Sequence, residues 1–322
     1  MRTMGELVNR IKYGHLLLST VLVLIVLSTP VLGGEIKADY LYKLSDFTGV
    51  VPYSWVRPVV DRKTHEIYVA NFSERSIRVF NENGMLVYEF GDDINIGNLY
   101  DLAIADDGNI LLLSYKGTAY ALTKCNFRGE PISTLEVRNL PPSFSKDFTP
   151  TVIFYHGGHI YLADKEAMKV VVADANGDFI DGYDLAAILE FDDKKKQDSG
   201  LVGFSVDREG NLLFTVPVIF QAYIVSPDRK VRSFGARGSS PGKFNIVGGI
   251  VADDKGTIYV TDTLRCVVMI FDKDFNFKTE FGYRGGAKDN LISPMELAID
   301  GDRLYVTQSR NRGVSVFRIT AN

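Results

Sequence analysis

DKGTIYVTDT, residues Asp254 to Thr263, is the stretch that decides the fold, because its apolar half recurs along the chain. The related segments are IYVAN at Ile67, ILLLS at Ile110, IYLAD at Ile160, LLFTV at Leu212, IYVTD at Ile258 and LYVTQ at Leu304. Their starts lie 43, 50, 52, 46 and 46 residues apart. A repeat of about 40 to 50 residues indicates an array of supersecondary units.

Each copy has the same neighbours. An apolar strand and a tight turn precede it, as in LAIADDGN and GIVADDKGT, where Asp or Asn beside Gly suits a hairpin. Another alternating strand, a second turn and a fourth strand follow it, as in IRVFNENGMLVYEFG. Four short antiparallel strands per unit are typical of a propeller blade. The sequence therefore predicts an all-β, six-bladed β-propeller as a single domain over residues 35–322.

The last unit has only three strands before Asn322, whereas DYLYKLSDF, Asp39 to Phe47, alternates like an outer strand and belongs to no unit of its own. We expect this N-terminal strand to complete the last blade and close the ring. Closure would cover the unpaired flanks that the first and last blades otherwise present.

Residues 1–34 differ from the rest of the chain. Basic residues precede the apolar run LLLSTVLVLIVL, and small residues follow it up to Gly33, the order of a secretory signal. We expect cleavage near Gly33, with an uncleaved membrane anchor as the alternative. Either outcome predicts a periplasmic or secreted domain. Loss of this segment moves the formal charge from −4 to about −6, which argues against nucleic-acid binding. We expect a monomer.

Cysteine and acidic motifs give little support for a metal site. Cys125 and Cys266 have no CxxC spacing, and we expect two separate thiols. The run DANGDFIDGYD, from Asp174, resembles a calcium loop at first, but it has Phe179 and Leu185 where such a loop needs Gly and Glu. We interpret the run as a hairpin turn.

The segment GSSPGKFNIVGGIVADDKGTIYVTDTLRCVVMIFDKDFNFKTEFG, Gly238 to Gly282, resembles an NHL repeat. That resemblance implies a six-bladed propeller. Known members of the NHL-repeat family include protein-binding and RNA-binding modules, ubiquitin-ligase receptors and peptide-amidating lyases. The lyases hold zinc in the channel with histidines from several blades. Here His65, His156 and His159 fall in turns expected on the opposite face, so we expect no shared zinc site. A ubiquitin-ligase role would need a RING segment, which the sequence lacks.

The candidate ligand-binding residues lie where first strands begin and second strands end, which in such propellers is one face around the channel mouth. They are Arg57, Asn71, Asp101, Tyr115, Asp164, Asp262, Glu296 and Gln308. Blades six, one and two are neighbours, so Glu296, Arg57 and Asp101 are predicted to converge. The alternative to a ligand site is a ring of polar side chains in which Arg57 bridges its neighbours and the others form hydrogen bonds with the backbone. No Ser/His/Asp set or phosphate loop appears, and no catalytic residue is assigned.

Two insertions exceed the regular period: RNLPPSFSKDFTP, and DLAAILEFDDKKKQDSG, which predicts one short helix. We expect both at the channel mouth, with exposed anchors such as Phe144. The function predicted from this pattern is an exported module that binds a protein, peptide or glycan in the cell envelope without a cofactor. The alternative is a metal-dependent lyase or lactonase-like enzyme, with Glu296, Asn71 and Asp262 near a divalent cation such as calcium.

Overall fold

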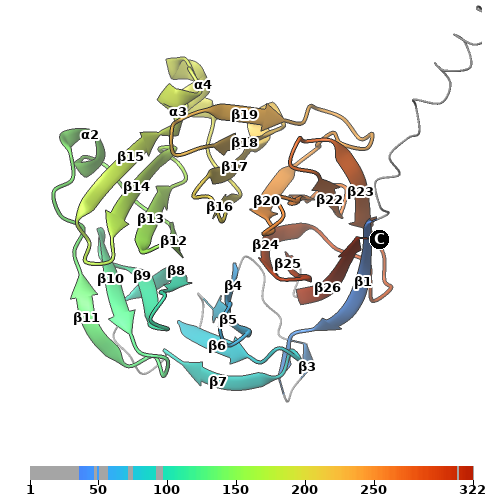
Figure 1. The fold of residues 1–322 in the computed structure, drawn as a ribbon, viewed down its shortest axis with the longest axis horizontal. Coiled ribbons are helices and arrows are strands. Elements are labelled where there is room, and N and C mark those ends of the chain that lie inside the picture. The colour runs from blue at the N-terminus through green and yellow to red at the C-terminus, as the bar shows by residue number, and fades with distance from the viewer. Residues whose placement is uncertain are drawn as a thin grey trace, which may run out of the picture. The chain divides into compact units, whose positions relative to one another are not determined.

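The computed structural model describes residues 36–46, 49–50, 57–71, 75–91, 97–309 and 312–321. The predicted signal or anchor segment therefore lies outside the described residues. Within them, Ile36–Thr320 form six four-stranded sheets around a central axis (Figure 1). The prediction of an all-β, six-bladed propeller is confirmed.

The first three blades follow the chain order from the inner to the outer strand. Blade 1 contains β4 (Pro58–Asp61), β5 (Glu66–Asn71), β6 (Ser76–Phe80) and β7 (Leu86–Phe90). Blade 2 contains β8 (Asn98–Ile104), β9 (Ile110–Lys116), β10 (Ala119–Cys125) and β11 (Pro131–Leu135). Blade 3 contains β12 (Val152–His156), β13 (His159–Asp164), β14 (Lys169–Asp174) and β15 (Phe179–Asp184).

The remaining blades repeat this arrangement. Blade 4 contains β16 (Phe204–Val206), β17 (Leu212–Val216), β18 (Gln221–Val225) and β19 (Val231–Phe234). Blade 5 contains β20 (Val247–Ala252), β21 (Ile258–Asp262), β22 (Val267–Phe271) and β23 (Phe277–Gly282). Blade 6 contains β24 (Pro294–Asp300), β25 (Arg303–Gln308), β26 (Gly313–Ala321) and β1 (Ile36–Lys43). A small hairpin joins β2 (Ser45–Asp46) to β3 (Gly49–Val50).

The turn that opens the repeated stretch explains its sequence. Asp253 Oδ1 accepts hydrogen bonds from the backbone N–H groups of Lys255 at 2.9 Å and Thr257 at 2.8 Å. Gly256 has a φ of +79°, a conformation that glycine adopts without a Cβ clash. The run from Asp174 forms the same kind of turn, because Asp174 Oδ1 accepts from the N–H groups of Asn176 and Asp178. Its interpretation as a hairpin is confirmed.

The hydrophobic core consists of clusters between neighbouring blades rather than one central mass. The described residues form six such clusters, one at each junction around the ring. Second and third strands are covered on both faces, so β22 (VVMIF) is buried at every position. This explains why these strands are continuously apolar while outer strands such as β23 alternate. Cys125 and Cys266 are free, buried thiols, as expected.

The N-terminal strand has the place that the sequence predicts. β1 lies beside β26 as the outer strand of blade 6 (Figure 1). Leu44 follows it, is fully buried in the junction between blades 6 and 1, and donates its N–H to Val314 O at 3.0 Å. The strand begins at Ile36, earlier than predicted, and Ser45–Asp46 pair with β3 instead of extending it.

The insertions differ from their prediction. The second contains two helices, α3 (Leu185–Ile188) and α4 (Asp193–Asp198), and the first contains α2 (Pro142–Ser145). All three lie at the outer edge of the ring in Figure 1 rather than over the channel. Phe144 is buried against Phe179, so its predicted role as an exposed anchor is wrong. None of the helices in the described ranges is long and apolar enough to cross a bilayer.

Candidate functional site

The first strand of every blade lies nearest the axis, so these strands form the channel wall (Figure 1). Each pairs with its second strand on one side only, which leaves its other edge toward the channel. The residues at the beginning of these strands therefore approach one another from different blades. They include Arg57, Asp101 and Glu296.

Arg57 and Asp101 form a nearly buried pair, with side chains 12% and 7% exposed. Arg57 Nε and Nη2 contact both carboxylate oxygens at 2.9 to 3.2 Å. Nη2 also donates to Leu102 O and Ile153 O, each at 2.8 Å. Burial raises the pKa of the Asp101 carboxyl, while Arg57 and the N–H of Ile153 oppose that rise. One guanidinium thus connects blades 1, 2 and 3.

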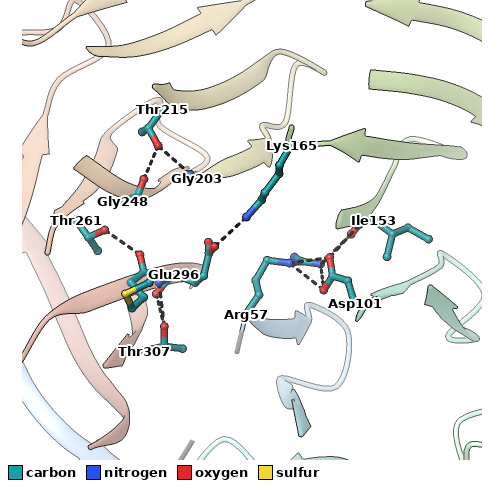
Figure 2. Close-up of polar contacts among 11 residues, drawn as sticks. Arg57, Asp101, Ile153, Lys165, Gly203, Thr215, Gly248, Thr261, Glu296 and Thr307 are labelled. Carbon is teal, nitrogen blue, oxygen red and sulfur yellow. Dashed lines mark hydrogen bonds and ion pairs between the residues drawn. The ribbon is translucent and has the colours of Figure 1, made fainter. Parts of the chain in front are cut away.

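The sequence predicted that Glu296 would join this pair, but it does not. Its Oε1 lies 3.3 Å from Lys165 Nζ, and the two side chains are 18% and 25% exposed. Lys165 follows β13 in blade 3, whereas Glu296 lies on β24 in blade 6, so the ion pair spans the channel. Figure 2 shows it beside the Arg57–Asp101 pair. A side chain that the sequence analysis missed is therefore the partner of Glu296.

Threonine hydroxyls join the inner strands in the other half of the ring (Figure 2). Thr215 Oγ1 donates to Gly248 O of the next blade at 2.6 Å and accepts from the N–H of Gly203. Thr261 Oγ1 donates to Met295 O of the next blade at 2.8 Å. Thr307 Oγ1 accepts from the N–H of Glu296 at 2.9 Å and so fixes the main chain of that residue.

The residues that end the second strands are buried and make hydrogen bonds to neighbouring loops. Asp164, Asp262 and Gln308 are at most 1% exposed. Asp164 accepts from the N–H groups of Thr149 and Ala167, and Asp262 from those of Asn245, Ile246 and Arg265. Gln308 Oε1 accepts from the N–H of Ile292, and its Nε2 donates to Ser315. These side chains hold the loops at the ends of their blades.

Tyr115 and Asn71 complete the predicted set. Tyr115 donates to Pro150 O at 3.1 Å and packs against Tyr100, with ring centroids 4.8 Å apart. Burial, with Asp164 nearby, raises the pKa of Tyr115 to about 12, so the phenol is neutral at physiological pH. Asn71 pairs with Ser76 through the backbone, and its side chain lies outside the described part. The structure therefore brings Arg57 and Asp101 together, places Asp164 near Tyr115, and pairs Glu296 with Lys165, a residue outside the predicted set.

Among the described residues, no group of three or more His, Cys, Asp or Glu side chains is placed to hold a metal ion. Two carboxylates of the channel wall, Asp101 and Glu296, each face a side-chain cation. Asp262, a predicted metal ligand, is engaged by backbone N–H groups.

A cavity of about 390 Å³ occupies the channel beyond the Arg57–Asp101 pair. Its lining begins at Arg57 and follows the first strands to the turns that join them to the second strands, including Lys63, Asp106, His156 and Arg208. It therefore lies toward the face opposite the predicted mouth. No local pattern in the sequence indicated this cavity, because its wall is made of strand edges from all six blades.

The comparisons with known proteins agree with this fold. The chain matches no known family description and none of the curated proteins. Solved structures that resemble it include virginiamycin B lyase from Staphylococcus aureus in a catalytically inactive form with quinupristin, at 13% identity and a TM-score of 0.57, over 85% of this chain and 84% of that one.

Two further neighbours are a calcium-binding protein, regucalcin, from Agrobacterium tumefaciens and a gluconolactonase from Xanthomonas campestris. The first has 16% identity and a TM-score of 0.57, covering 88% of this chain and 98% of that one. The second has 12% identity and a TM-score of 0.55, covering 87% and 89%. At this identity the likeness shows the propeller fold, and function must be argued from the site.

Proposed function

We propose that this chain is an enzyme that acts on a small carbonyl compound, such as a lactone, in the central channel. The observation that carries the proposal is the Lys165–Glu296 pair, which places an amine and a carboxylate 3.3 Å apart inside the channel. Two neighbours are named as a lyase and a gluconolactonase, which supports an enzyme over a pure binding module. The NHL-like segment Gly238–Gly282 is consistent with the same ring of blades.

The pair has the groups that ester opening requires. Glu296 would accept a proton from a water molecule as that water attacks the carbonyl carbon. The bond between the carbonyl carbon and the ring oxygen then breaks, and Lys165 would donate a proton to the leaving oxygen. Transfer of the proton from Glu296 to Lys165 across their contact restores both groups. The fixed main chain of Glu296 keeps the carboxylate in place.

The test compares Glu296→Gln and Lys165→Met with Glu166→Gln, an exposed neighbour in the same loop. Release of acid from five- and six-membered lactones would be followed with a pH indicator. Loss of the general base should lower kcat/KM by about 100-fold or more, whereas Glu166→Gln should match the unaltered chain. Equal turnover by Glu296→Gln, or no turnover of any lactone, would contradict the proposal. Because Glu296 already faces the Lys165 amine, a chelator should leave the rate unchanged. Loss of turnover with the chelator and its return on addition of calcium would favour the metal-dependent alternative.

A second candidate is an exported, periplasmic or secreted module that binds a protein, peptide or glycan. Helix α4 favours this candidate, because none of its residues is buried in the propeller. Because Leu185 and Ala186 of α3 are part of the core, the informative deletion removes residues 192–198 alone. Loss of capture from envelope extract would support this candidate, and equal capture with and without α4 would count against it.

A further inference from the structure

We infer that the cavity beyond the Arg57–Asp101 pair is a binding site for a small carboxylate that carries further hydrogen-bonding groups. Neither Lys165 nor Glu296 lines the cavity, whose lining on β24 begins at Leu297, one residue beyond Glu296. The inference is therefore independent of the proposed enzyme activity. A volume of about 390 Å³ is in the range of small-molecule sites.

Arg57 is one of the residues that line this cavity. Its Nε and Nη2 make all the hydrogen bonds to Asp101, Leu102 O and Ile153 O, and no described residue accepts a hydrogen bond from Nη1. The ring of Phe154 lies under the guanidinium, with its centroid 4.1 Å from Cζ. The group is thus held rigidly with one nitrogen left for a ligand. Arginine N–H groups bind carboxylates through short, charge-assisted hydrogen bonds.

The walls add neutral donors and acceptors. Strands such as β12 and β16 are the inner edges of their sheets, so their channel-facing N–H and C=O groups have no partner strand, although those of Ile153 on β12 already bond to Asp101 and Arg57. Both strands line the cavity, as do β4, β8, β20 and β24. Unpaired backbone groups at a strand edge suit hydroxyl groups, which both donate and accept. A ligand with a carboxylate and several hydroxyls matches this lining better than an apolar one.

The outer end of the cavity carries further positive charge. Arg208 is exposed there, and no described side chain bonds to it. Arg62, also in the lining, pairs with Asp254 of blade 5 at 3.1 Å, but both side chains are more than half exposed. Such a pair contributes little to stability and can open. Three carboxylates, Asp61, Asp106 and Asp207, also line the cavity and would oppose an anion. Asp61 already accepts the N–H of Lys63, and Asp207 accepts those of Glu209 and Asn211.

The test measures binding of erythronate and of erythritol to the purified full chain by calorimetry at one ionic strength. The two compounds differ only in the carboxylate. Erythronate should bind with a Kd of about 1 mM or lower, and erythritol about tenfold more weakly or not at all. Arg208→Ala should weaken erythronate binding severalfold, and Arg284→Ala, an exposed arginine outside the cavity lining, should not. Equal binding of both compounds, or no binding of either, would overturn the inference.

The location of the ligand has its own readout. His156 lines the cavity, whereas His159, on the next strand of the same hairpin, does not. Erythronate should shift the ring signal of His156 in the NMR spectrum and leave that of His159 in place. Arg57→Lys should abolish binding of erythronate. This variant also weakens the Arg57–Asp101 pair and could fail to fold. In that event, the His156 and His159 signals of the unaltered chain test the location of the ligand. A bound ligand that leaves His156 unmoved would refute the location.

Discussion

Arg57 donates to both carboxylate oxygens of Asp101 and thereby fastens blade 1 to blade 2 at the wall of the channel. Arg57→Met would leave the Asp101 carboxylate buried without its cation. We expect a loss of about 3 to 5 kcal/mol in the free energy of unfolding, measured with urea. Adding Asp101→Asn should recover part of that loss, since the buried charge is then gone. Strictly additive effects of the two substitutions would contradict this coupling.

The close approach of blades 5 and 6 requires Gly249. A Cβ at this position would lie 2.5 Å from Met295 O and 2.9 Å from Glu296 Cα, both main-chain atoms that cannot turn aside. Gly249→Ala should therefore destabilise the protein by about 1 to 3 kcal/mol. Gly286→Ala is the matched control, because a Cβ there meets no atom within 4 Å. Similar melting temperatures for the two variants would show that the inner strands have room to move.

Closure of the ring depends on Leu44. Its side chain is fully buried among residues of blades 1 and 6, including Ile67, Phe80 and Val316. Leu44→Ala should cost about 2 to 5 kcal/mol through lost contacts and the cavity left behind. Leu264→Ala, at a residue 54% exposed, should change the free energy of unfolding little. Chemical denaturation of both variants checks the prediction, and a harmless Leu44→Ala would argue against a tight seam.

His65 and Asp300 make the same seam sensitive to pH. Their Nδ1 and Oδ2 atoms lie 2.6 Å apart, and the hydrogen bond to Asp300 raises the pKa of His65 above its ordinary value of 6.5. A raised pKa means that the folded state binds the proton more tightly. The stabilisation is therefore complete below pH 6.5 and disappears as the pH rises through the folded-state pKa. Melting temperatures measured across this window should fall, and His65→Asn should flatten that part of the profile.

The candidate site shows why prediction succeeded in part. The sequence placed Arg57, Asp101 and Glu296 at the beginning of first strands, and the first two do meet. No local pattern singled out Lys165, because its contact with Glu296 arises only from the positions of blades 3 and 6 on opposite sides of the channel. The threonines at 215, 261 and 307 did leave a signal, since each stands just before the last residue of its repeated segment.

The sequence by itself determined the blades. Alternating apolar residues and Asp-Gly turns are local features that act within a hairpin, so six copies specify six sheets and their order. The tertiary structure alone decided which charges pair across the channel, that Asp164 and Asp262 serve their own loops, and where the cavity lies. Those outcomes depend on how closely the blades approach around the axis. That approach is set by packing between residues distant in the chain.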